Sequence, residues 1–162
     1  MSLWTSFKMH VRDACEQDAE ICCSVVRRSI TLLCILDHQG DAASLELWLA
    51  NKTAANMRRW IREHHVLVAV DGTAIAGVAA KTSLGEIILN YVSPDARFRG
   101  VSKALLRGLE ARAANLGIPL LKLQSTATAR RFYEAMGYTA CGSPTKGFGL
   151  STGQPMQKHL RQ

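Results

Sequence analysis

The stretch YVSPDARFRGVSKALL, residues 91–106, decides the fold of this 162-residue chain. It reads as the end of a strand, a proline-containing turn, an Arg-x-x-Gly loop at residues 97–100 and the first turns of a helix. Backbone N–H groups at the start of a helix attract phosphate groups, because they are unpaired and the helix dipole is positive there. Gly100 lets the backbone approach such a ligand without an intervening Cβ atom. The stretch therefore predicts a mixed α/β fold with an anion site between strand and helix.

Hydrophobic periodicity divides the rest of the chain into helices and strands on both sides of this stretch. Strands are expected at 7–12, 65–70, 73–80, 85–92 and 119–124, and helices at about 18–33, 102–116 and 126–135. A further helical region, in one or two pieces, follows the turn at 38–41, and two weak strands surround a glycine-rich loop after Tyr138. The order predicts a single domain over residues 1–162, with a mixed, mostly antiparallel sheet of six to seven strands and about four helices.

Composition restricts the possible functions. Hydrophobic residues make up 48% and charged residues 20% of the chain, which excludes a disordered or collagen-like protein. Lysine and arginine number 20 against 13 acidic residues, so the formal charge of +7 favours an anionic partner such as nucleic acid or a phosphorylated cofactor. No apolar run is long enough to cross a membrane, and no signal peptide is recognised, so we expect a cytoplasmic protein. The five cysteines are interpreted as reduced thiols, with a nucleophilic Cys34 or Cys141 as the alternative.

Two motifs in this order resemble those of the GNAT family of N-acetyltransferases. Residues 97–102, RFRGVS, are similar to the family's acyl-CoA loop Arg/Gln-x-x-Gly-x-Gly/Ala, and the strand before it ends in Val-x-Pro. Ser102 departs from the pattern, since the family usually has Gly or Ala there. Residues 129–138, ARRFYEAMGY, resemble the downstream motif A-x-x-F-Y-x-x-x-G-F/Y, with Thr126 where many members have Asn. The chain is thus identified as a member of the GNAT family.

This resemblance implies acetyl-CoA as the acyl donor, bound without a metal ion. It also implies that strands 85–92 and 119–124 are parallel neighbours that splay apart, so that the pantetheine arm inserts between them. Backbone groups near Asn90 would bond this arm, and an N–H of Tyr91 or Val92 would polarise the thioester carbonyl. The donor-binding residues expected on this basis are Asn90, Tyr91, Val92, Arg97, Phe98, Arg99, Gly100, Val101, Ser102, Lys103, Thr126 and Ala129.

Two catalytic residues follow from the same resemblance. Tyr133 is expected to protonate the leaving thiolate, with a buried core tyrosine as the alternative. Glu86 is expected to deprotonate the amine, directly or through water, because the histone acetyltransferase branch has a glutamate at this strand position. Strand alternation places Glu86 on the same face as Asn90 and Val92. A solvated strand-end glutamate is the alternative, and Gln124 is a further candidate for positioning a water.

The predicted function is acetyl transfer from acetyl-CoA to a primary amine by direct attack in a ternary complex. The acceptor is expected to be a small molecule or a peptide, and the protein a monomer or homodimer that binds neither membrane nor nucleic acid. Asp37, His38 and Asp41 are candidates for the acceptor side, with ordinary turn residues as the alternative. A non-catalytic acyl-CoA-binding module is the competing function.

Overall fold

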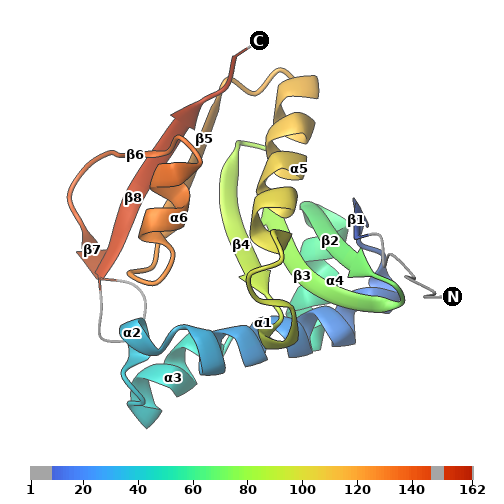
Figure 1. Ribbon diagram of the computed structural model, residues 1–162, viewed down its shortest axis with the longest axis vertical. Coiled ribbons are helices and arrows are strands. Elements are labelled where there is room, and N and C mark those ends of the chain that lie inside the picture. The colour runs from blue at the N-terminus through green and yellow to red at the C-terminus, as the bar shows by residue number, and fades with distance from the viewer. Residues whose placement is uncertain (1–8, 147–151, 162) are drawn as a thin grey trace, which may run out of the picture.

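The computed structural model describes residues 9–146 and 152–161, which form a strongly twisted sheet covered by helices on both faces (Figure 1). The strands follow the order β1-β2-β3-β4-β5-β8-β6, and β7 also pairs with β8. The strands are β1 (His10–Asp13), β2 (His65–Asp71), β3 (Ala74–Lys81), β4 (Glu86–Val92), β5 (Leu120–Ser125), β6 (Thr139–Ala140), β7 (Thr145–Lys146) and β8 (Thr152–His159). The helices are α1 (Ala19–Leu33), α2 (Ile35–His38), α3 (Ala42–Leu49), α4 (Ala54–Glu63), α5 (Val101–Asn115) and α6 (Arg130–Ala135).

Two hydrophobic cores lie on opposite faces of the sheet. The α5 core includes Leu105 and Leu109 of α5 and Leu121 of β5, all fully buried. The α1 core includes Val26 and Ile30 of α1, which pack on β3 and β4. Apolar residues three and four positions apart on each helix produce these buried faces, as the periodicity predicted.

The mixed, mostly antiparallel sheet and flanking helices confirm the predicted fold class. The sheet has eight strands rather than six to seven, because the tail contributes β6, β7 and β8. The glycine-rich loop expected in this tail lies largely at residues 147–151, outside the described residues. Six helices are described rather than about four, since the region after α1 divides into α2, α3 and α4. No helix in the described part of the chain is long and apolar enough to cross a membrane.

The parallel pair β4 and β5 separates soon after it forms. Only two residue pairs are in register, Glu86 with Lys122 and Ile87 with Leu123, whereas β4 stays paired with β3 as far as Val92. Figure 1 shows β4 and β5 close at one end and far apart at the other, with α1 running across the open end. The predicted splay is present, and it leaves the second half of β4 without a partner on its β5 side.

A β-bulge in β4 changes which side chains face the splay. Ala80 of β3 pairs with Leu89 and Lys81 pairs with Ile87, so Ile88 is the extra residue. Such a bulge interrupts the strict alternation of a strand. Ile87 accordingly packs in the α5 core, whereas Leu89, two residues later, packs in the α1 core.

The bulge corrects the expected face of Glu86. Val92 packs on the α5 core and Asn90 contacts Tyr133 of that core, so both point toward α5 and α6. Glu86 points the other way, because its neighbour Ile87 belongs to the α5 core. The prediction that Glu86 shares a face with Asn90 and Val92 is therefore wrong, since one inserted residue reverses the alternation between them.

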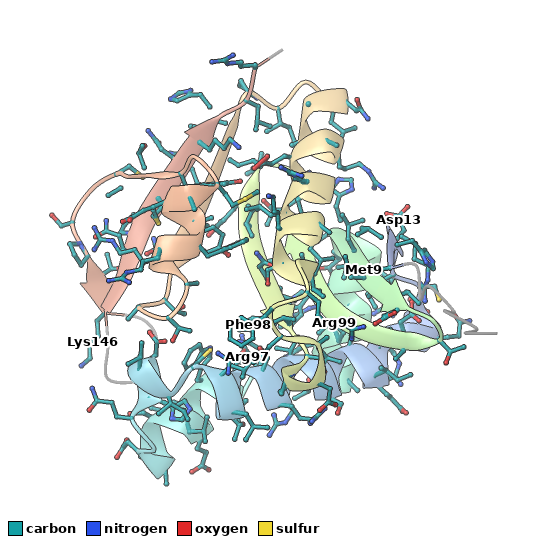
Figure 2. The ribbon with its side chains drawn as sticks, viewed as in Figure 1. Met9, Asp13, Arg97, Phe98, Arg99 and Lys146 are labelled. Atoms are coloured by element: carbon teal, nitrogen blue, oxygen red, sulfur yellow. The ribbon has the colours of Figure 1, made fainter. Side chains whose placement is uncertain are left out.

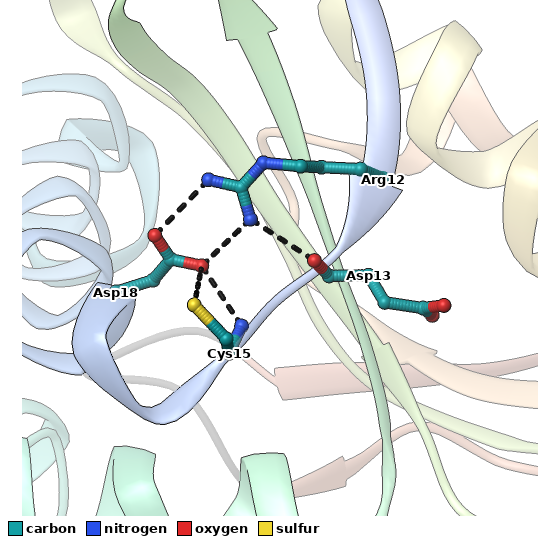
Figure 3. A network of polar contacts seen from close by, with 4 residues as sticks. All are labelled: Arg12, Asp13, Cys15 and Asp18. Atoms are coloured by element: carbon teal, nitrogen blue, oxygen red, sulfur yellow. Dashed lines mark hydrogen bonds and ion pairs between the residues drawn. The ribbon is translucent and has the colours of Figure 1, made fainter.

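An ion pair connects β1 to the segment just before α1. Arg12 of β1 donates from both terminal nitrogens to the Asp18 carboxylate, at 2.7 and 3.1 Å, and Asp18 also accepts from the backbone N–H of Cys15 (Figure 3). Hydrogen bonding from Arg12, followed by that from Cys15, outweighs burial and lowers the pKa of Asp18 to about 2. This contact joins β1 to the segment that leads into α1.

Candidate active site

A hollow of about 320 Å³ lies where β4 and β5 separate. Its walls come from β4, β5, α6, the loop before α5 and the last turns of α1. Nine of the residues predicted from the sequence line it: Asn90, Tyr91, Val92, Arg97, Phe98, Ser102, Thr126, Ala129 and Tyr133. The structure therefore brings together two motifs that are separated by about thirty positions in the chain.

The Arg-x-x-Gly loop has the backbone geometry that its sequence predicted. Gly100 precedes α5 with φ +76°, in the left-handed region, and no side chain of the described residues caps this helix N-terminus. The first N–H groups of α5 are therefore available to an anion. Phe98 also has a positive φ of 61°, an uncommon and strained conformation for a residue with a Cβ. Strain of this kind is concentrated at functional sites.

The charged side chains of the loop separate into two directions (Figure 2). The Arg97 guanidinium stacks over the Phe98 ring at 4.6 Å, beside the hollow, and the Phe98 side chain is 93% exposed. Arg99 turns toward β2, where it forms a 2.7 Å ion pair with Asp71. Arg97 thus lines the hollow while Arg99 anchors the loop to the sheet. Lys103 is exposed on α5 and does not line the hollow.

Gly77 of β3 determines how closely α5 approaches the sheet. A Cβ at this position would lie 2.6 Å from Cγ1 of Val101, 2.8 Å from Cδ1 of Leu105 and 3.1 Å from the Tyr91 carbonyl oxygen. The first two distances are too short for real contacts and the third is tight, so the absence of a side chain lets the first turn of α5 pack directly on β3 and β4. Sequence reasoning missed this residue, because an isolated glycine in a strand does not reveal which helix packs against it.

Tyr133 lies on the α5 side of the hollow and is 6% exposed. The Nδ2 of Asn90 donates a hydrogen bond to the Tyr133 hydroxyl at 3.3 Å. Burial raises the pKa of this phenol to about 12, although the Asn90 hydrogen bond acts in the opposite direction. The hydroxyl therefore remains protonated throughout the neutral range, as a general acid requires.

Glu86 is not brought into this hollow. It is exposed at the start of β4 and lines a second hollow, of about 620 Å³, on a different part of the sheet. Lys122, its register partner on β5, lines the same space. Leu123 and Gln124 line both hollows, so β5 is the wall that they share.

The three acceptor-side candidates after α1 make contacts with the backbone. The Asp37 carboxylate is fully buried and accepts from the backbone N–H groups of Ala127 and Thr128 and from the Thr128 hydroxyl, at 2.7, 3.3 and 2.5 Å. His38 accepts from the Gly40 N–H through Nδ1 and faces two carbonyl groups of α1 through Nε2. Asp41 accepts from the Ser44 N–H and caps α3. Asp37 thus joins α2 to the turn before α6.

The wall contributed by α1 was also missed by sequence reasoning. Ser29, Leu33 and Cys34 line the hollow opposite α6. Burial raises the pKa of the Cys34 thiol to about 12, so this cysteine is a poor nucleophile. Thr126, on the opposite wall, accepts from the Ala129 N–H at 3.1 Å and organises the turn before α6.

Among residues 9–146 and 152–161, no group of three or more His, Cys, Asp and Glu side chains is arranged to hold a metal ion. An acyl-CoA arm, by contrast, fits the residues that are present. The unpaired half of β4 offers backbone groups, α5 offers free N–H groups, and the Asn90 Oδ1 is a buried acceptor without a partner in the described structure. Each of these groups can be satisfied by a ligand with amide and phosphate groups.

Comparison with known proteins agrees with this geometry. Residues 30–160 match the family model for the acetyltransferase (GNAT) domain. Since this match covers most of the chain, the protein belongs to the GNAT acetyltransferase family. No curated protein matches the chain.

Solved structures share the fold across nearly the whole chain. A GCN5-related N-acetyltransferase from Rhodopseudomonas palustris superimposes with a TM-score of 0.84 at 23% identity, covering 93% of this chain and 95% of that one. The PaiA N-acetyltransferase of Thermoplasma acidophilum, solved with coenzyme A, gives 0.78 at 18% identity, with 94% and 99% covered. YncA of Salmonella typhimurium, solved with acetyl-CoA, gives 0.71 at 19% identity, with 96% and 95% covered.

Proposed function

We propose that this protein transfers an acetyl group from acetyl-CoA to a primary amine, by direct attack within a ternary complex. The observation that supports this most strongly is the meeting of the Arg-x-x-Gly loop, the unpaired half of β4 and Tyr133 around one hollow. Positioning an amine against a thioester in such a space supplies much of the rate enhancement, because it removes the entropic cost of a bimolecular encounter.

The donor-binding roles are proposed from these positions. The N–H groups of Gly100, Val101 and Ser102 and the side chain of Arg97 would bind the pyrophosphate. Backbone groups of Asn90 and Val92 would bond the amides of the pantetheine arm, with Tyr91 or Val92 donating to the thioester oxygen. Phe98 would shape the loop, Arg99 and Lys103 would add positive charge, and Thr126 and Ala129 would line the opposite wall.

The acid and the base are proposed on opposite faces of the sheet. The amine nitrogen attacks the carbonyl carbon, the C–N bond forms, and the C–S bond breaks with its electron pair going to sulfur. Tyr133, on the α5 face, would protonate the departing sulfur. Glu86, on the other face, would accept the proton that the amine loses, through water in the second hollow. The amine would then lose its proton on one face of the sheet and the thiolate would gain a proton on the other, so the two proton transfers do not interfere.

The acceptor is proposed to enter along the α1 wall, where Ser29, Leu33 and Cys34 line the hollow. These side chains are uncharged, and the nearby carboxylate of Asp37 is committed to the turn before α6. An acceptor amine on an uncharged small molecule or peptide suits this wall better than a polycation does.

The first experiment is thermal melting with acetyl-CoA, CoA or ATP at millimolar concentration. A ligand at about 100 times its Kd adds about 2.7 kcal/mol to stability, and this shift is readily measured. We expect both CoA species to raise Tm and ATP to have little effect. No shift with either CoA species would contradict a donor site. Stabilisation without turnover across a broad amine panel would instead favour a non-catalytic acyl-CoA-binding module.

Replacement of Glu86 tests the proposed base. Glu86→Gln should shift the low-pH limb of the kcat/KM profile for the amine, while acetyl-CoA still raises Tm. Lys122→Gln, on the neighbouring strand in the same hollow, is the matched control and should keep that limb. An unchanged profile in Glu86→Gln would remove this residue from the mechanism.

A further inference from the structure

Asn90 occupies an unusual position for a polar side chain. It follows the Ile88 bulge, points into the hollow, and lies on the part of β4 that has no partner on its β5 side. The neighbouring side chains on this wall, Leu123 and Phe132, are apolar. A leucine would fill the same space without burying an amide, so the presence of asparagine calls for a polar partner.

The two ends of the Asn90 amide are in different situations. The Nδ2 donates to the Tyr133 hydroxyl at 3.3 Å. The Oδ1 is buried and has no hydrogen-bond partner within the described residues. A buried acceptor without a donor is unfavourable, and such atoms in folded proteins are explained by a bound water or a ligand.

We propose that Asn90 is a positioning residue for acetyl transfer, which orients the Tyr133 hydroxyl through Nδ2 and accepts an N–H of a bound substrate through Oδ1. This inference rests on the proposed function, because it assigns the partner of the general acid. It adds a side-chain role to a residue whose backbone alone was expected to act.

The direction of the hydrogen bond determines where the Tyr133 proton goes. Since the phenol oxygen already accepts from Nδ2, the O–H bond of Tyr133 points away from Asn90 and into the hollow. When Tyr133 gives its proton to the sulfur, the C–S bond pair is on sulfur and the phenol oxygen carries the negative charge. The Nδ2–H then bonds to that charged oxygen, and a hydrogen bond to a charged partner is stronger than one to a neutral partner.

The Oδ1 needs an N–H donor, and both substrates of the proposed reaction provide one. The amide groups of the pantetheine arm carry N–H, and so does the attacking amine. The shared chemistry is an N–H group held beside the Tyr133 hydroxyl. Separate measurements of donor affinity and amine KM distinguish the two sources.

Three variants test the proposal. Asn90→Leu removes both ends of the amide and keeps its branched shape, and Asn90→Asp keeps the shape and the acceptors but removes the N–H. We expect each to lower kcat about 10- to 100-fold. Thermal melting should show both variants folded, since neither leaves a cavity. Asn115→Leu, at the exposed end of α5, is the matched control and should keep the parent kcat.

A double-mutant cycle separates this role from packing. In a Tyr133→Phe background, Asn90→Leu should change kcat less than threefold, because the hydroxyl that Asn90 orients is gone. Independent, multiplicative effects would overturn the positioning role. Full activity in Asn90→Asp would also overturn it, since the N–H would then be unnecessary.

The same variants locate the partner of Oδ1. A rise of about tenfold in the acetyl-CoA Kd for Asn90→Leu, with amine KM unchanged, assigns the N–H to the pantetheine arm. A rise in amine KM alone assigns it to the acceptor. If neither changes, the Oδ1 part of the proposal is wrong. Failure of the parent protein to bind acetyl-CoA would instead contradict the proposed function. Full activity of Tyr133→Phe alone would contradict the acid role of Tyr133 and, with it, the positioning role of Asn90.

Discussion

Residues 85–138 and residues 14–64 form the two sides of the candidate active site, and they differ in how their roles are encoded. In the first region, the Arg-x-x-Gly loop at residues 97–100 and helix α6, which carries Tyr133, are continuous motifs whose backbone geometry follows from local sequence. In the second region, Asp37 bonds to Ala127 and Thr128, 90 and 91 positions away. The geometry of such motifs can be predicted from sequence because it depends on residues that are close together in the chain. Long-range contacts cannot be predicted in this way, since the packing of the whole fold decides which distant residues meet.

The largest expected effect is a loss of kcat, and it tests residues 85–138, the side of the site whose geometry follows from local motifs. Tyr133→Phe should lower kcat by roughly 10²- to 10⁴-fold if the phenol is the acid, with acetyl-CoA binding preserved. Tyr138→Phe is the matched control: Tyr138 is also buried, but its hydroxyl bonds to Glu110 at 3.2 Å and does not line the hollow. The control should reduce stability slightly and leave kcat unchanged. Steady-state kinetics that show equal losses in both variants would deny Tyr133 a specific role.

The second prediction tests residues 14–64, the side of the site that depends on long-range contacts. Asp37→Ala leaves two backbone N–H groups and the Thr128 hydroxyl without their acceptor, so we expect the free energy of unfolding to fall by about 2–4 kcal/mol. Asp41→Ala, four residues later, removes only a helix cap and should cost about 1 kcal/mol. Urea unfolding measures both. Equal losses would show that Asp37 does not hold α2 to the α6 turn.

The third prediction concerns the packing of β3 against the first turns of α5, which follow the Arg-x-x-Gly loop. Gly77→Ala places a methyl group against Val101, Leu105 and the Tyr91 carbonyl, and overpacking of this kind costs about 1–3 kcal/mol. The shift of α5 should also weaken acetyl-CoA binding. Gly108→Ala, in the middle of α5, meets only the flexible end of Leu67 at 3.0 Å and the Val11 side chain at 3.4 Å. Calorimetric titration with acetyl-CoA should show unchanged affinity for this control and reduced affinity for Gly77→Ala.

The smallest expected effect concerns pH. The folded-state pKa of Asp18 is lowered to about 2 by Arg12 and Cys15, below the unfolded value near ~3.9. A lowered pKa contributes stability above the unfolded value, and this contribution is lost as pH falls from about 4 toward 2. Because the Arg12 side chain is 40% exposed, we expect only about 1–2 kcal/mol.

Asp18→Asn checks this effect. Its unfolding free energy should be lower than that of the parent protein at pH 7, and the two should converge near pH 2. Glu20→Gln is the control, since Glu20 forms an exposed ion pair with Arg58 and should change little. A difference between Asp18→Asn and the parent that stays constant with pH would contradict a contribution from the ionised carboxylate.

Local geometry could be predicted from sequence where the spacing of residues fixes it, and could not where it depends on the packing of other elements. The positions of Arg97, Gly100 and Tyr133 followed from motifs that include their own strand, loop and helix. The face of Glu86 was wrong, because a single bulge residue at Ile88 shifts every later side chain to the opposite face and leaves no compositional signal. The roles of Gly77 and of the Asn90 side chain were also missed, because they depend on neighbours from other helices and strands.

The sequence by itself determined the family, the mixed α/β class and the backbone geometry of the Arg-x-x-Gly loop, since hydrophobic periodicity, turn residues and helix N-termini act over a few positions. Only the tertiary structure decided which face each residue of β4 presents, that Asp37 binds the turn before α6, and that the Asn90 side chain bonds to the Tyr133 hydroxyl at the wall of the hollow. These depend on strand register and on contacts between segments up to ninety residues apart. Such contacts are selected by the packing of the whole core, which no local pattern of residues specifies.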